Sequence, residues 1–267
     1  MNQTFFDPLL LWQFNIFSSQ TEVAHYVSGK GGGVSENGTL NLSYKTIDEP
    51  GNVEKNRSLV AASLGLSPNK LLFPEQTHSV NIKLVSTTTR PEDMLDTDAL
   101  ISNVPGICIS VLSADCVPVL LYDPVKKAVG ALHAGWRGTV GKLLEKTIQA
   151  MIDNFKTNPS DIIVGIGPSI SPQVYEVGEE VIAAARKAFA TTDGILISSE
   201  KPDKAFFNLW EANKRQALAM GVLPAHIEVA ELCTYTNSDQ FFSARKVKNQ
   251  PGRFAAGIVI KEPVEQN

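Results

Sequence analysis

The sequence predicts an α+β fold, a multilayer α/β sandwich of mixed sheets that forms a single domain. Strand candidates outnumber helix candidates, and several strands follow each other directly, so the strict alternation of a doubly wound fold is absent. No linker, internal repeat or low-complexity segment divides the chain. Its 267 residues suffice for one large domain with a substantial core. We expect that domain to span residues 1–267, with its core at about 23–261.

The first third of the chain contains strand candidates on either side of a helix. A helix is expected over residues 53–64, where Asn52 can cap its start and Gly65 can end it. The apolar runs that indicate strands are residues 22–28 and 71–73.

The middle of the chain is rich in apolar runs of strand length. These runs are residues 80–86, 99–102, 107–113, 117–122, 128–134 and 162–167. One longer segment, residues 142–155, has its apolar residues at helical spacing and predicts a helix.

The last third predicts two helices and the closing strands. Residues 179–190 form the first helix, and residues 209–220 form the second, which ends at Gly221. Asn208 with Glu211 three residues later resembles a capping box at the start of the second helix. The strand candidates are residues 227–230, 241–245 and 254–260.

Composition excludes several classes of function. A net charge of −4 gives no general attraction to nucleic acid or anionic membrane, and no stretch has the 18 uncharged apolar residues of a membrane span. Residues 1–17 are apolar but lack a basic start, so they indicate entry into the core rather than a signal peptide. Three cysteines without an export signal indicate a reducing, cytoplasmic location. No obligate protein partner is evident.

His78, Cys116 and His133 form the candidate site. One thiolate and two imidazoles are ligands that zinc prefers, and three protein ligands leave the open fourth position of a catalytic site. Their spacing is no compact signature, because 38 positions separate the first pair and 17 the second. Their placement is more informative: His78 follows the short apolar run 71–73, Cys116 lies in a tight break between the runs 107–113 and 117–122, and His133 comes at the end of a third run. Strand ends of this kind are where scaffolds often present reactive groups.

Linked motifs along the chain resemble the laccase-domain family. They include GGVSENGTLNLS, QTHS, TDALIS, SADCVPVLLYDP, HAGWRGT and FFSAR, and the resemblance runs from about residue 29 to about residue 260. Members of this family were first called polyphenol oxidases and are now described as purine nucleoside phosphorylases with adenosine deaminase activity. The chain departs from the family pattern at Lys30, where arginine is frequent, and at Ala244, where an aromatic residue is frequent.

The resemblance implies a four-layer sandwich and a zinc ion bound by His78, Cys116 and His133. It implies cytoplasmic phosphorolysis of adenosine, inosine, guanosine or 5′-methylthioadenosine to the base plus ribose 1-phosphate or methylthioribose 1-phosphate. It also implies deamination of adenosine to inosine. The expected partners are therefore purine nucleosides and inorganic phosphate. Copper is a possible alternative occupant, because a site of nitrogen and sulfur ligands binds Cu²⁺ more tightly than Zn²⁺.

The expected catalytic residues are Cys116, His133 and Asp115. Zinc would lower the pKa of a bound water for deamination, and Asp115 would move protons or orient a histidine ligand. For substrate binding we expect Lys30, Gly33, Arg57, Gln76 and Arg137. Lys30, Arg57 and the glycine run would hold phosphate, although glycines also serve in turns and an arginine on a helix often faces solvent.

Two alternatives stay open from the residues. Cys116 and His133 could be a metal-free nucleophile and base in a hydrolase or amidase acting on cell-wall peptide precursors, with Asp115 or Gln76 orienting. The chain could also be a non-catalytic interaction module stabilised by zinc.

Overall fold

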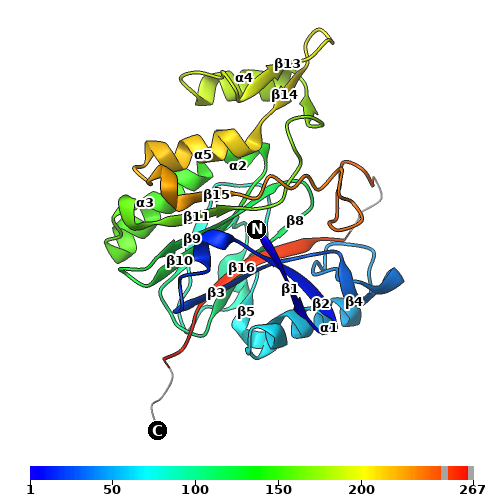
Figure 1. Cartoon of the computed structure of the whole chain (residues 1–267), viewed down its shortest axis with the longest axis vertical. Coiled ribbons are helices and arrows are strands. Elements are labelled where there is room, and N and C mark those ends of the chain that lie inside the picture. Colours follow the sequence, from blue (N-terminus) through cyan, green and yellow to red (C-terminus); the bar gives the residue numbers. More distant parts are fainter. Residues whose placement is uncertain (248–251, 264–267) are drawn as a thin grey trace.

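Two six-stranded sheets carry the fold in the computed structural model, which describes residues 1–247 and 252–263 (Figure 1). The first sheet has the order β1 (Asn2–Phe6), β2 (Leu9–Gln13), β3 (Val23–Ser28), β16 (Phe254–Ile260), β8 (Cys108–Ser113), β5 (Leu71–Leu72). The second has the order β15 (Ile227–Val229), β11 (Ile163–Ile166), β9 (Val117–Asp123), β10 (Ala128–Ala134), β7 (Ala99–Ser102), β6 (Ile82–Leu84). Both sheets are mixed, because one parallel pair in the first and two in the second accompany antiparallel pairs.

Smaller elements complete the fold. A three-stranded sheet joins β12 (Glu176–Val177), β14 (Ala205–Phe207) and β13 (Leu196–Ser198), and β4 (Gly31–Ser35) forms only isolated bridges. The helices are α1 (Pro50–Ser63), α2 (Trp136–Val140), α3 (Leu143–Phe155), α4 (Glu179–Ala188) and α5 (Leu209–Ala219). Short 3₁₀ helices are Asn15–Phe17, Glu36–Gly38, Pro68–Lys70, Pro91–Met94, Pro159–Asp161 and Pro224–His226.

The elements stack as four layers, with α1 on the first sheet and the helices α3 and α5 on the second (Figure 1). Strand β9 shows how the sequence produces these layers. Val119 and Leu121 face the helical layer, whereas Leu120 and Tyr122 face the first sheet, because successive side chains of a strand point to opposite faces. Apolar residues on both faces bury the inner strands β7, β9, β10 and β11 of the second sheet, whereas its edge strands β6 and β15 are partly exposed. This arrangement confirms the predicted α+β sandwich. The bounds 1–267 and 23–261 stay a prediction.

Two local predictions needed correction. Helix α1 begins at Pro50 rather than after Asn52, since proline suits the first helical turn, and the Asn52 side chain donates instead to Asp48. Residues 241–245 are not a strand: Phe241 and Phe242 are buried in the core, but their backbone joins no sheet. An apolar run can therefore be buried without strand pairing.

The Asn208 cap is confirmed, because its side chain accepts a hydrogen bond from the Glu211 backbone N–H at 3.0 Å. The hairpin β1–β2, the strand β4, the helix α2 and the small sheet were not predicted. Each is short, so its periodicity carries little signal.

Throughout residues 1–247 and 252–263, every helix is too short or too polar to span a bilayer.

Candidate functional site

A cavity of about 800 Å³ opens beside the start of β9 and the end of β10. Its wall comes from segments far apart in the sequence. The main lining residues are Ser43, Tyr44, Lys45, Arg57, Phe73, Gln76, His78, Ser113, Asp115, Cys116, His133, Ile170, Tyr175, Arg245 and Arg253. The cavity therefore combines aromatic rings and several cationic side chains with the predicted ligand set.

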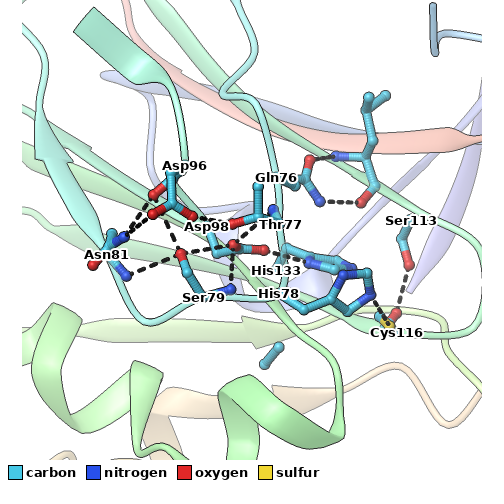
Figure 2. A network of polar contacts seen from close by, with 12 residues as sticks. Gln76, Thr77, His78, Ser79, Asn81, Asp96, Asp98, Ser113, Cys116 and His133 are labelled. Carbon is cyan, nitrogen blue, oxygen red and sulfur yellow. Dashed lines mark hydrogen bonds and ion pairs between the residues drawn. The ribbon is translucent and has the colours of Figure 1, made fainter. Parts of the chain in front are cut away.

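The predicted ligands His78, Cys116 and His133 come together at one end of this cavity. Their ligand atoms all lie within 4.8 Å of one another. Cys116 directly precedes β9, and the antiparallel register pairs His133 of β10 with Pro118 of β9, which brings the thiol and the imidazole to the same hairpin end. His78 arrives from the loop after β5, with its Nε2 3.9 Å from the Cys116 Sγ (Figure 2).

Gly135 leaves the space that this cluster needs. A Cβ at this position would lie 2.8 Å from the Cys116 Sγ and 3.2 Å from the His78 Cδ2. Two imidazole nitrogens and one sulfur are ligands of the kind that zinc and copper accept, and in the described part of the chain this cluster offers three of them. The residues therefore fit a metal site with one open position.

The electrostatics of the cluster favour a thiolate. Burial alone would raise the pKa of Cys116, but the charge of His133 and hydrogen bonds from both histidines outweigh it and lower this pKa. Burial alone would likewise lower the pKa of His133, but the nearby Cys116 thiolate and the hydrogen bond to Asp98 raise it. A thiolate is the form in which cysteine binds a metal or attacks a substrate.

The backbone is left-handed at both His78 and Asp115, with φ values of 65° and 87°. Such values are uncommon for residues other than glycine, and they persist only where the surroundings hold them. Here they turn the two ligand-bearing segments into the cavity.

Asp115 lines the cavity, but its carboxylate has other contacts than those predicted. One oxygen accepts from the Thr234 hydroxyl and the other from the Arg245 backbone N–H, both at 2.6 Å. The carboxylate that orients a histidine is instead Asp98, 2.9 Å from the His133 Nδ1. Asp115 therefore ties the Cys116 loop to two later segments, and its part in proton transfer stays a prediction.

Of the predicted substrate-binding residues, Arg57 and Gln76 line the cavity. The Gln76 amide is engaged with the backbone of Leu112, accepting at 2.7 Å and donating at 2.8 Å. These two hydrogen bonds fix the segment before His78 against β8. Both the oxygen and the nitrogen of the Gln76 amide therefore already have partners.

Lys30, Gly33 and Arg137 do not belong to the cavity lining. The Lys30 Nζ donates to the Ser238 carbonyl at 3.2 Å, and Arg137 lies 3.7 Å from Glu180 at the surface. Gly33 packs so closely on the backbone of residues 39–40 that a Cβ would overlap it. Close packing, rather than an anion cradle, accounts for this glycine.

Four residues at or behind the cavity wall were missed: Asp98, Tyr175, Arg245 and Arg253. Asp98 had a weak signal, because it is a charged residue directly before an apolar strand. Arg245 lay in a segment that was predicted as a strand. Burial lowers the pKa of Arg253, while the negative groups Cys116 and Asp115 counter that effect, which locates this cation near the thiol.

The sequence matches the protein family described as multi-copper polyphenol oxidoreductase laccase over residues 24–261. A purine nucleoside phosphorylase of Bacteroides thetaiotaomicron is 39% identical over 256 residues, which cover 92% of this chain and 95% of that protein. Adenosine deaminase RL5 of an unknown prokaryotic organism is 34% identical, over 83% of this chain and 87% of that protein. The crystal structure of the hypothetical protein YfiH of Bacillus licheniformis superimposes with a TM-score of 0.88 at 30% identity, covering 95% of this chain and 96% of that one.

Proposed function

The chain belongs to the multi-copper polyphenol oxidoreductase laccase family, and on that basis we propose that it is a zinc-dependent purine nucleoside enzyme. It cleaves adenosine, inosine, guanosine or 5′-methylthioadenosine with phosphate, and it deaminates adenosine to inosine. Relatives named purine nucleoside phosphorylase and adenosine deaminase support these activities.

The observation that carries the proposal is the His78, Cys116 and His133 cluster at the end of a cavity of about 800 Å³. A cavity of this size accommodates a ligand of nucleoside dimensions. A bound zinc ion would supply Lewis acidity and a water of lowered pKa. The chain itself would supply the thiolate and imidazole ligands, the aromatic rings of Tyr44 and Phe73 as an apolar wall, and the cations that attract phosphate.

A multicopper oxidase relay does not fit these residues. Such a relay needs a histidine-rich cluster beside a His₂Cys centre, and the chain has only four histidines. His25 stacks on the Phe14 ring and makes an edge contact with Phe17, and its Nε2 accepts from the Phe14 backbone N–H at 2.8 Å. Copper therefore remains an alternative occupant of the single cluster.

The proposal is tested by incubating the purified, zinc-loaded protein with a nucleoside panel, with and without inorganic phosphate. We expect free base and ribose 1-phosphate only when phosphate is present, and inosine from adenosine in both conditions. Absence of base release and of inosine from a protein that holds zinc would contradict the proposal.

Arg57 is the residue best placed to hold the phosphate. Its Nε and Nη2 both donate to the Leu42 carbonyl, at 3.0 and 2.8 Å, and its guanidinium stacks between the rings of Tyr44 and Phe73. These contacts fix the group in the cavity wall but go to a carbonyl and two aromatic faces, so they do not neutralise its charge. A fixed guanidinium in a partly dry cavity favours an anionic ligand.

We expect Arg57→Ala to raise the KM for phosphate by about ten- to 150-fold, because one charge-assisted contact contributes about 1.5–3 kcal/mol. Deamination should change much less, since it uses no phosphate. Lys30→Ala is the matched control, because Lys30 lies outside the cavity lining and should leave the phosphate KM unchanged. Steady-state kinetics at varied phosphate measure both. An Arg57→Ala protein with the wild-type phosphate KM would remove Arg57 from the phosphate site.

One observation favours the alternative of a metal-free hydrolase or amidase. Cys116, His133 and Asp98 lie in the order nucleophile, base and orienting carboxylate. Chelation separates the two functions. The zinc enzyme should lose both nucleoside activities on chelation and regain them with zinc, whereas a cysteine hydrolase should gain activity on amide substrates as its thiol is freed.

A further inference from the structure

Asp98 lies to one side of the two histidine ligands, where it contacts His133 itself and the backbone beside His78 (Figure 2). It directly precedes β7, and its side chain has 0% exposure. One of its carboxylate oxygens faces His133, and the other faces the residues on either side of His78. A fully buried carboxylate is costly unless hydrogen bonds satisfy it, so its partners indicate what it does.

The Oδ1 of Asp98 is 2.9 Å from the His133 Nδ1. An ionised carboxylate only accepts hydrogen bonds, so the Nδ1 must carry the proton. In the neutral imidazole, which is the form that binds a metal, the lone pair is then on Nε2, the nitrogen available to the Cys116 cluster. This contact therefore sets the tautomer in which His133 can bind a metal.

The Oδ2 of Asp98 holds the turn that carries His78. It accepts from the backbone N–H of Thr77 at 3.1 Å, from the backbone N–H of Ser79 at 2.7 Å and from the Ser79 hydroxyl at 3.0 Å. These donors flank His78, whose left-handed backbone is unfavourable for a residue other than glycine and needs such support.

We propose that Asp98 is a positioning residue that presents both histidine ligands to the metal through a single carboxylate. One oxygen fixes the tautomer of His133, and the other fixes the backbone turn at His78, so the two ligands are placed relative to each other by one group. The proposal rests on the metal site of the proposed function but not on which reaction that site performs.

Asp96 provides a matched control, because it anchors the same loop without touching His133. Its carboxylate accepts from the Thr77 hydroxyl and from the Asn81 amide. A carboxylate that only stabilised the loop would act through contacts of this kind. Both aspartates hold the loop, but only Asp98 contacts His133 and the backbone N–H groups beside His78.

The test is Asp98→Asn, which keeps the shape of the side chain but replaces one acceptor with a donor. If the amide oxygen stays on the backbone donors of Thr77 and Ser79, the NH₂ group faces the His133 Nδ1 and forces the proton to Nε2. If the amide is reversed, the NH₂ group faces the backbone donors and the His78 turn loses its support. Either orientation damages one ligand.

We expect zinc affinity, measured by competition with a chromogenic chelator, to fall by ten- to 100-fold in Asp98→Asn. The thiolate-to-metal absorption of the cobalt-loaded protein should change with it, a signature that a purely structural role would not alter. Asp96→Asn should keep wild-type affinity and spectrum. A wild-type zinc affinity in a folded Asp98→Asn protein would overturn the proposal. A wild-type protein that binds no zinc would instead overturn the metal site of the proposed function.

A second measurement uses the wild-type protein, so it tests the proposal even if Asp98→Asn does not fold. In the zinc-loaded wild-type protein, imidazole nitrogen NMR should show His133 bound through Nε2 and protonated at Nδ1. Zinc bound through Nδ1 would contradict the role of Asp98.

Discussion

Replacing Cys116 with alanine should remove the metal from the protein and reduce both phosphorolysis and deamination by at least about 10³-fold, since metal polarisation and water activation together contribute several kcal/mol. The thiolate would be the anionic member of the proposed ligand set, and its sulfur lies within 4.8 Å of the ligand nitrogens of both histidines. Without it, two neutral imidazoles would hold the ion weakly. Elemental analysis after dialysis and assays on adenosine with and without phosphate measure the two effects.

Cys108→Ala is the control for this prediction. Cys108 is a buried cysteine of β8 whose thiol lies 3.6 Å from the Ser110 hydroxyl, and burial raises its pKa to about 12. It is thus a packed small side chain with an unreactive thiol, and its loss should leave metal content and both activities unchanged. If Cys116→Ala kept one zinc per chain through dialysis, the proposed ligand set would be wrong.

The sequence carried enough information to select the three candidate ligands, and the reason is local. Cys116 and His133 bracket the hairpin of β9 and β10, whose apolar runs are long and unambiguous, so their proximity follows from antiparallel pairing. His78 is different. Its approach depends on a loop after the short strand β5, and it was indicated by its residue type, by its place after a short apolar run and by the family resemblance.

Asp98 shows what local patterns could not supply. Its two sets of partners lie 19 to 21 residues before it and 35 residues after it, and no helical or strand periodicity links such positions. Asp98 meets these partners only when β7 pairs with β10 and the His78 loop folds over the ends of both strands. The charged residue is visible in the sequence, but its partners are a property of the tertiary structure.

Gly33 was predicted to hold phosphate, but it lies outside the cavity lining. The sequence was ambiguous here because glycine has several uses. A glycine run can form an anion nest, a turn or a close approach of backbones, and these look alike in a sequence. In the structure, Gly33 lies in β4 against the backbone of residues 39–40, whereas Arg57 of α1 reaches the cavity. Of the residues predicted to hold phosphate, Arg57 is the one that lines the cavity.

Gly135→Ala should weaken metal binding by steric crowding alone. Gly135 precedes α2 with φ −68° and ψ −179°, a conformation that alanine adopts freely, so backbone strain is not involved. Its new Cβ would lie 2.8 Å from the Cys116 Sγ and 3.2 Å from the His78 Cδ2, and both side chains would have to move. Overpacking of this kind costs about 1–3 kcal/mol, which corresponds to about a five- to 150-fold loss of zinc affinity if the displacement falls on the ligands.

Gly138→Ala separates this crowding from a general effect on α2. A Cβ at Gly138 would meet its nearest neighbours, the His133 carbonyl oxygen and Leu143, at 3.4 and 3.5 Å, which is ordinary contact, and alanine favours the helix. This variant should keep wild-type zinc affinity, whereas Gly135→Ala should lose affinity and retain the thermal stability of the metal-free fold to within a few degrees. Chelator competition and thermal unfolding on the two proteins measure the contrast. Equal zinc affinity in both would mean that the Cys116 sulfur does not need the space that Gly135 leaves, and it would count against this sulfur as a ligand.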